Sequence, residues 1–146
     1  MADPSAHHIG ITVRDLDVAT EFYRSVFDCE TIAAFTADGE AFPTGVDIDH
    51  ARPDFVHLDL GSVRLDLVAY EPTGDDRLPA ALNNAGATHL GVTVDDVDEF
   101  YASLPESVST LSPPQTTATG TTICFLRDPD DTLIEVLNPD AGGNES

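Results

Sequence analysis

The ten residues HIGITVRDLD, at positions 8–17, return later in the chain as HLGVTVDDVD, at positions 89–98. Six of the ten positions are identical in register, and three more exchange one apolar residue for another. Only Arg14, which corresponds to Asp95, changes in character. Chance is a poor explanation for such a match, so the chain reads as two copies of one structural unit.

Each copy begins with residues that alternate between apolar and polar, as in a strand with one face on the core. An Asp-rich segment follows and leads into apolar residues spaced i, i+3, i+4 and i+7, which predicts a helix in each copy. The residues with this spacing are Ala19, Phe22, Tyr23 and Val26 in the first copy, and Val97, Phe100, Tyr101 and Leu104 in the second.

Further alternating or apolar runs predict three more strands in each copy. They cover residues 31–36, 55–60 and 63–70, then 107–111, 121–127 and 132–137. Each unit is therefore β-α-β-β-β. The predicted fold class is α+β, with two βαβββ modules whose eight strands form a cup-shaped sheet with the helices outside.

The predicted boundaries place module one at residues 6–70 and module two at 87–139, within a single domain spanning 1–146. Residues 71–86 are rich in turn-forming residues and are expected to link the modules. Residues 37–54 contain two Pro and two Gly, and we expect a long irregular connection that is either a lid or a plain loop.

The charge of the chain is unusual. Against 27 Asp and Glu stand six Arg and no Lys, which gives a formal net charge of -21. Such a surface suits high salt, because screening at about 1 M ionic strength shortens the Debye length to roughly 3 Å. We therefore predict a halophilic protein. Nucleic acid is an unsuitable partner for this surface.

The two cysteines, Cys29 and Cys124, lie 95 positions apart and form no Cys-x-x-Cys motif, so we expect both to be reduced and structural. The start of the chain lacks the features of a signal peptide, and no apolar run approaches the roughly 20 residues of a membrane span. The expected location is the cytoplasm, with no membrane partner.

Strand alternation predicts which side chains face the inside of the cup. Five metal-ligating or titratable side chains share that face: His8, His57, Asp66, His89 and Glu135. Arg64 is the only basic side chain predicted there, where it could pair with Asp66 or Asp59 or receive a substrate anion. For any single acid, a solvated position on a sheet face is the simpler interpretation, but the repetition in both units favours a shared site.

Two imidazoles with one or two carboxylates match the ligands of a divalent transition metal, here Zn, Ni, Mn, Co or Fe. This set of ligands includes no thiolate that would favour a structural zinc site. His57 is equally compatible with a purely structural role and with a role in acid/base catalysis.

These motifs resemble the vicinal oxygen chelate superfamily, which includes glyoxalase I, methylmalonyl-CoA epimerase, extradiol dioxygenases and fosfomycin-resistance proteins. The resemblance covers nearly the whole chain. It rests on the repeated first strands, on Phe22-Tyr23, on the strand Val63 to Val68, and on Asp128-Pro129-Asp130 leading to Ile134-Glu135.

The resemblance implies four metal ligands, namely His8, Asp66, His89 and Glu135. Two positions depart from the family pattern. Asp66 is one methylene shorter than the usual Glu or Gln, so its direct coordination is the weakest assignment. Asp131 stands where the family often has Gly, which suggests a wider turn.

The ligand pattern is most similar to glyoxalase I and implies a metal-dependent lyase or isomerase. Such an enzyme stabilises an enediolate of a 2-oxoaldehyde thiol adduct or a similar small molecule with vicinal oxygens. The predicted catalytic residues are Glu135 or Asp66 as base, with His57 in an acid/base role.

An alternative is an extradiol-type Fe(II) dioxygenase, because His8, His89 and Glu135 alone form a two-His, one-carboxylate triad with open positions. A metal-free binding or resistance protein is a third possibility. Members of the family pair units within a chain or across a dimer, so we expect a homodimer, with the site formed in either way.

Overall fold

The computed structural model describes residues 3–76 and 81–139, and the chain divides into two compact units, residues 1–76 and 77–146. Part of the predicted linker, residues 77–80, lies outside the described residues. The predicted module boundaries stay a prediction.

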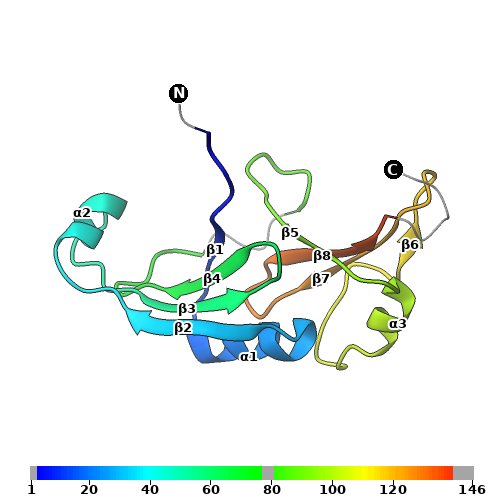
Figure 1. The fold of residues 1–146 in the computed structure, drawn as a ribbon, viewed down its shortest axis with the longest axis horizontal. Helices are drawn as coiled ribbons and strands as arrows, with labels where there is room; N and C mark the ends of the chain where they lie inside the picture. Colours follow the sequence, from blue (N-terminus) through cyan, green and yellow to red (C-terminus); the bar gives the residue numbers. More distant parts are fainter. Residues whose placement is uncertain (1–2, 77–80, 140–146) are drawn as a thin grey trace. The chain divides into compact units, whose positions relative to one another are not determined.

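Unit 1 contains four strands and two helices (Figure 1). They are β1 (His8–Thr12), α1 (Leu16–Phe27), β2 (Glu30–Thr36), α2 (Ala41–Val46), β3 (Asp54–Asp59) and β4 (Arg64–Ala69). The strand order is β1-β4-β3-β2, with β1 parallel to β4 and the other neighbours antiparallel.

Unit 2 repeats this topology. Its elements are β5 (Leu90–Thr93), α3 (Val97–Ala102), β6 (Gln115–Thr116), β7 (Thr122–Arg127) and β8 (Leu133–Asn138), in the order β5-β8-β7-β6. Again the first strand is parallel to the last and the others are antiparallel. The prediction of an α+β fold with two βαβββ units is therefore confirmed, with the eight strands in two four-stranded sheets.

Both predicted helices are present, and an aspartate is the N-cap residue of each. Asp15 accepts a hydrogen bond from the backbone N–H of Val18 (3.1 Å), and Asp96 accepts one from that of Glu99 (3.0 Å). Such caps satisfy backbone donors that have no partner within the helix.

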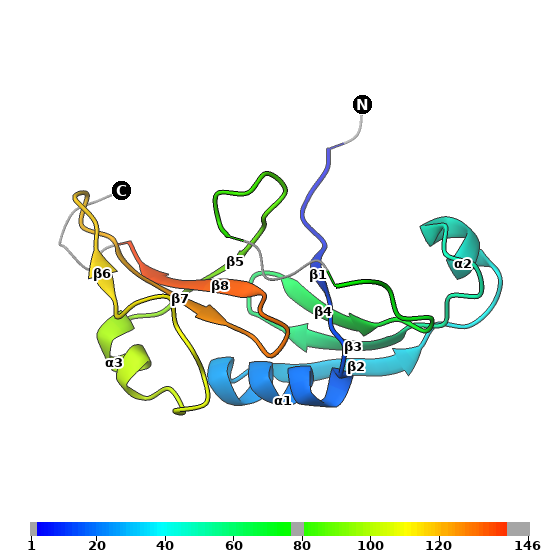
Figure 2. The same cartoon turned by 180° about the vertical axis from the view of Figure 1, so that it is seen from behind.

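One face of each sheet carries a helix. In unit 1, α1 lies beside the sheet (Figure 2). It packs against β3 and β4 and buries Ala19 and Tyr23. In unit 2, α3 packs against β7 and β8. The fully buried strand residues belong to this layer, and they are Leu58, Leu65 and Leu67 in unit 1 and Leu126, Ile134 and Val136 in unit 2. The opposite face of each sheet keeps its polar side chains.

The connection at residues 37–54 was predicted to be irregular, but it contains the short helix α2. Pro43 and Gly45 discouraged a helix assignment. Pro43 lies in the first helical turn, where a missing N–H removes no intrahelical hydrogen bond, so the proline is tolerated there.

The predicted strand at 107–111 is wrong as a continuous element. Only Thr110 forms a bridge there, to Leu126, although the backbone N–H of Leu111 also donates to the carbonyl of Phe125 (2.9 Å). The fourth strand of this sheet is instead β6. Pro113 and Pro114 separate the two paired segments, because proline has no N–H to donate to the ladder.

Asp131 occupies the turn between β7 and β8 with a left-handed backbone, φ 67°. Asp128 organises the turn, because its Oδ1 accepts hydrogen bonds from the N–H groups of Asp130 (2.8 Å) and Thr132 (2.9 Å). Asp thus takes a conformation usually given to Gly, which short polar residues tolerate better than others. None of the helices in the described residues is long and apolar enough to cross a membrane.

Candidate functional site

Asp66 lies at the centre of the polar face of unit 1. The register of β3 and β4 places His57 directly opposite Asp66, and the parallel pairing of β1 with β4 places Gly10 beside it. His57 Nε2 is 3.5 Å and His8 Nε2 is 3.6 Å from Asp66 Oδ2. Three of the predicted site residues, His8, His57 and Asp66, therefore lie together in this unit.

Arg64 binds Asp66 with both ends of its guanidinium fork. Nε donates to Oδ1 (2.6 Å) and Nη2 donates to Oδ2 (2.9 Å). The Asp66 side chain is only 5% exposed. Burial acts to raise the pKa of Asp66, but the hydrogen bonds from Arg64 and the nearby His57 outweigh it, so that pKa lies below its usual value. Asp66 is therefore a fixed anion, held in a bidentate pair.

His57 is the most enclosed imidazole of the site, with its side chain 12% exposed. Burial lowers the pKa of His57 below its usual value, against the opposing effect of Asp66. The ring lies against Phe35 and Phe55, at centroid distances of 5.0 and 5.8 Å. A neutral imidazole in an aromatic setting is able to accept a proton at neutral pH.

Unit 2 presents a simpler pair. His89 Nε2 lies 3.2 Å from Glu135 Oε1, and the His89 ring contacts Phe125 at a centroid distance of 5.1 Å. The Glu135 side chain is 20% exposed and so remains accessible. Glu135 corresponds to Asp66, since both lie on the last strand of a unit opposite the parallel first strand, Glu135 beside Gly91 and Asp66 beside Gly10.

The described residues thus hold three His–carboxylate pairs, His8–Asp66 and His57–Asp66 in unit 1 and His89–Glu135 in unit 2. His8–Asp66 and His89–Glu135 occupy corresponding positions in the two units. Within the same described residues, no group of three or more His, Cys, Asp or Glu side chains is arranged to hold a metal ion. Each unit therefore brings together two of the four predicted metal ligands, His8 with Asp66 in unit 1 and His89 with Glu135 in unit 2.

The prediction that Arg64 is the only basic side chain on these faces is wrong. Arg127 opposes Leu133, and Phe125 opposes Glu135, in the ladder of β7 with β8. Because side chains alternate along a strand, Arg127 shares the sheet face of Phe125 and Glu135. The alternation of residues 121–127 in the sequence already places Arg127 on this face.

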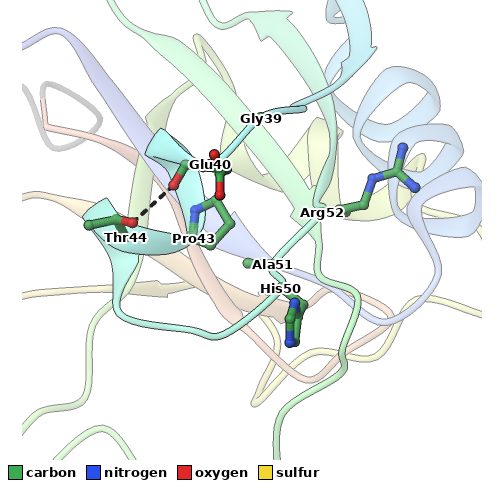
Figure 3. Close-up of a pocket in the computed structure, with 7 residues that line it drawn as sticks. All are labelled: Gly39, Glu40, Pro43, Thr44, His50, Ala51 and Arg52. Atoms are coloured by element: carbon green, nitrogen blue, oxygen red, sulfur yellow. Dashed lines mark hydrogen bonds between the residues drawn. The ribbon is translucent and has the colours of Figure 1, made fainter.

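A separate cavity of about 310 Å³ lies beside α2 in unit 1 (Figure 3). Its lining residues are Gly39, Glu40, Pro43, Thr44, His50, Ala51 and Arg52, and none is a predicted metal ligand. The Thr44 hydroxyl donates to the carbonyl of Glu40 (3.0 Å), and Arg52 pairs with Asp38 (2.9 Å). Two of its polar side chains are therefore already partnered.

Known structures with a similar fold come from the glyoxalase family. A glyoxalase family protein from Bacillus cereus has a TM-score of 0.82 at 20% identity, covering 94% of this chain and 97% of that one. A lactoylglutathione lyase from Agrobacterium tumefaciens has a TM-score of 0.61 at 21% identity, covering 94% and 95%. At these identities the likeness shows the fold alone.

Sequence comparison gives the family. A 2-epi-5-epi-valiolone epimerase from Actinomyces sp is 30% identical over 149 residues, covering 94% of this chain and 81% of the epimerase. The family model of one superfamily matches residues 5–136, which is most of the chain. With its doubled βαβββ topology and this match, the chain belongs to the Glyoxalase/Bleomycin resistance protein/Dioxygenase superfamily.

Proposed function

We propose that the protein is a metal-dependent isomerase or epimerase that moves a proton on a carbon beside a carbonyl group of a small, oxygen-rich substrate. The observation that carries this proposal is the repeated His–carboxylate pair, His8–Asp66 in one unit and His89–Glu135 in the other. Similarity to an epimerase favours proton transfer over the other reactions of the superfamily.

The donor atoms of His89 and Glu135 are spaced as two ligands of one metal would be, and those of His8 and Asp66 lie slightly farther apart. Ligands at about 2.1 Å from a metal, at tetrahedral or octahedral angles, lie roughly 3.0–3.4 Å from each other. The two pairs have separations of 3.6 and 3.2 Å. The proposed ligands are His8, His89 and Glu135, with Asp66 as the fourth, and a bound divalent ion would polarise the oxygens of the substrate.

Arg64 adds a positive charge to this site. Two neutral imidazoles, two carboxylates and a divalent ion sum to zero, and the guanidinium on Asp66 adds one positive charge. A net positive site stabilises the negative charge that develops on a carbonyl oxygen when a neighbouring proton leaves. Arg64 would thus favour enediolate formation.

Glu135 is the proposed base. Its carboxylate is accessible, whereas Asp66 is buried and held at both oxygens by Arg64. The proton would pass from the substrate carbon to Glu135 and then return to carbon. His57 is the second proposed proton-transfer group, since its lowered pKa keeps the imidazole neutral and able to accept a proton.

Solvent deuterium exchange tests the reaction class. Protein loaded with Zn, Ni, Mn or Co is incubated in D2O with 2-epi-5-epi-valiolone or a 2-oxoaldehyde thiol adduct, and NMR follows deuterium at the carbon beside the carbonyl. We expect Glu135→Gln to abolish exchange and the exposed control Glu99→Gln to retain it. Exchange at the wild-type rate in Glu135→Gln would contradict the proposal.

Metal binding is measured on its own by calorimetry with the apoprotein. His8→Ala and His89→Ala are each expected to lower the affinity for the divalent ion by 10-fold or more, as for lost ligands or their partners. His50→Ala is the control, because His50 lies outside the site, beside α2. If His8→Ala and His89→Ala bound the ion as tightly as the wild type and His50→Ala do, the proposed metal site would be wrong.

One observation favours a second candidate, an extradiol-type dioxygenase. Because Arg64 engages both oxygens of Asp66, the ligand set can reduce to His8, His89 and Glu135, the triad of non-haem Fe(II) oxygenases. Oxygen uptake with Fe(II) and a catechol that survives Asp66→Ala but not His89→Ala would select this reaction over proton transfer.

A further inference from the structure

Arg127 is a half-buried cation, and one of its donor atoms is unused. Its Nη1 atom is shielded from solvent, and it has no hydrogen-bond partner among the residues that the structure describes. A buried donor without a partner is unfavourable, more so when it belongs to a charged group. Such a group in a native protein calls for an explanation, and one explanation is a bound ion or ligand that completes it.

The composition of the chain makes this unpaired donor unexpected. With 27 acidic side chains for six arginines, an acidic partner is easily available. Three other arginines have one, since Arg14 pairs with Asp76, Arg52 with Asp38 and Arg64 with Asp66. Arg127 forms no ion pair with any described residue, although it is surrounded by an acidic protein.

The two units differ at this position in a specific way. In unit 1 the residue two before the site carboxylate is Arg64, which opposes Asp59 and neutralises Asp66. In unit 2 the corresponding pair is Leu133 opposite Arg127, so the cation has moved to the neighbouring strand. Leu133 cannot neutralise Glu135, and Arg127 is left with donors to spare.

We propose that Arg127 binds an anionic group of the substrate, a carboxylate or a phosphate, on the sheet face that carries Glu135 and Phe125. This inference rests on the proposed function, because it takes the face of Glu135 as the place where substrate binds. Arg64 and Arg127 then have different tasks: one holds a protein carboxylate, and the other receives an anion from solution. A planar guanidinium fork suits either anion.

Anion binding is tested on the full chain after metal removal with a chelator. Calorimetry at constant potassium chloride concentration measures the binding of inorganic phosphate and, separately, of acetate. Saturable binding of at least one probe is expected for the wild type. Arg127→Met should weaken it by about tenfold or more, since a charge-assisted hydrogen bond is lost.

Arg24→Met is the matched control, because it removes the same charge from an exposed position on α1. We expect it to bind the probe as the wild type does. Arg127→Lys keeps the charge but loses the fork, and should give intermediate affinity. No saturable binding of either probe to the wild type, or equal binding by Arg127→Met, would overturn the proposal.

Thermal unfolding separates ligand binding from a structural role. If Arg127 exists for a ligand, Arg127→Met relieves an unsatisfied buried donor, and its Tm is unchanged or higher without phosphate. A clear fall in Tm would assign Arg127 to structure instead and contradict the inference. Metal affinity of the wild type is measured alongside anion binding. Anion binding without metal binding would contradict only the proposed function, and metal binding without anion binding would contradict only this inference.

Discussion

At the scale of single residues, the ionisation state of Asp66 decides the chemistry of unit 1. A buried carboxylate is unfavourable unless it is paired and hydrogen-bonded. Arg64 supplies two hydrogen bonds, and His57 and His8 lie at 3.5 and 3.6 Å. Asp66 therefore remains ionised in a position where an unpaired acid would become protonated.

Replacing Arg64 by Met should destabilise the protein, because Asp66 is then left buried without its hydrogen-bonded partner. We expect a larger loss in the free energy of unfolding than for an exposed pair, because the Asp66 side chain is only 5% exposed. Chemical denaturation of the metal-free protein measures it.

Arg52→Met provides the control for this substitution. The pair of Arg52 with Asp38 is exposed, so its loss should cost less than about 1 kcal/mol. Equal losses in Arg64→Met and Arg52→Met would mean that burial of Asp66 does not govern the strength of its pair.

At the scale of elements, the helix starts show how directly local sequence acts. The Asp15 side chain caps α1 through the backbone N–H of Val18, and Asp96 does the same in α3. Both caps come from the aspartates of the repeated stretch. The repeat therefore encodes the strand, the turn and the start of the helix together.

Asp15→Ala should reduce stability by about 1 kcal/mol, the usual effect of losing an N-cap. The mechanism predicts that Asp15→Asn retains most of the stability, because an amide oxygen also accepts the hydrogen bond. Glu21→Ala, at an exposed position of the same helix, should be close to neutral. A neutral Asp15→Ala in thermal unfolding would show that α1 depends on packing alone.

The buried layer between α1 and its sheet supports a second prediction at this scale. Leu67 on β4 is fully buried, so Leu67→Ala should cost about 2–5 kcal/mol through lost burial and the cavity left behind. Leu111, which is 46% exposed, is the control, and Leu111→Ala should have a small effect. Denaturation midpoints that fall equally for both would contradict the assigned core.

At the scale of the whole molecule, charge dominates. A net charge of -21 on 146 residues produces self-repulsion that favours expanded states. Raising the ionic strength from 0.1 to 1 M shortens the Debye length from about 10 to about 3 Å, which screens much of that repulsion. The homodimer and the cytoplasmic location stay predictions.

The protein should therefore become more stable as potassium chloride increases over this range. Thermal unfolding of the metal-free protein is expected to show a rising Tm. The double variant Asp49→Asn, Asp98→Asn, altered at two exposed positions, should show a weaker dependence on salt. A Tm that stays flat or falls would contradict the halophilic interpretation.

The sequence by itself determined the features that near neighbours carry. The repeat at 8–17 and 89–98 gave two units, alternation gave the polar faces with His57, Asp66 and Glu135, and helical spacing gave both packed helices. These inferences succeed because periodicity and capping depend on residues within a few positions of each other.

Only the tertiary structure decided which groups are paired. Three features depend on strand register and burial. They are the two hydrogen bonds from Arg64 to Asp66, the interruption of the sheet edge at Pro113 and Pro114, and the Arg127 donor that lacks a partner within residues 3–76 and 81–139. Register joins residues far apart in the chain, and burial depends on everything packed around a side chain. The sequence thus supplied the candidate ligands, while the fold determined that Asp66 has a partner and that Arg127 Nη1 has none among the described residues.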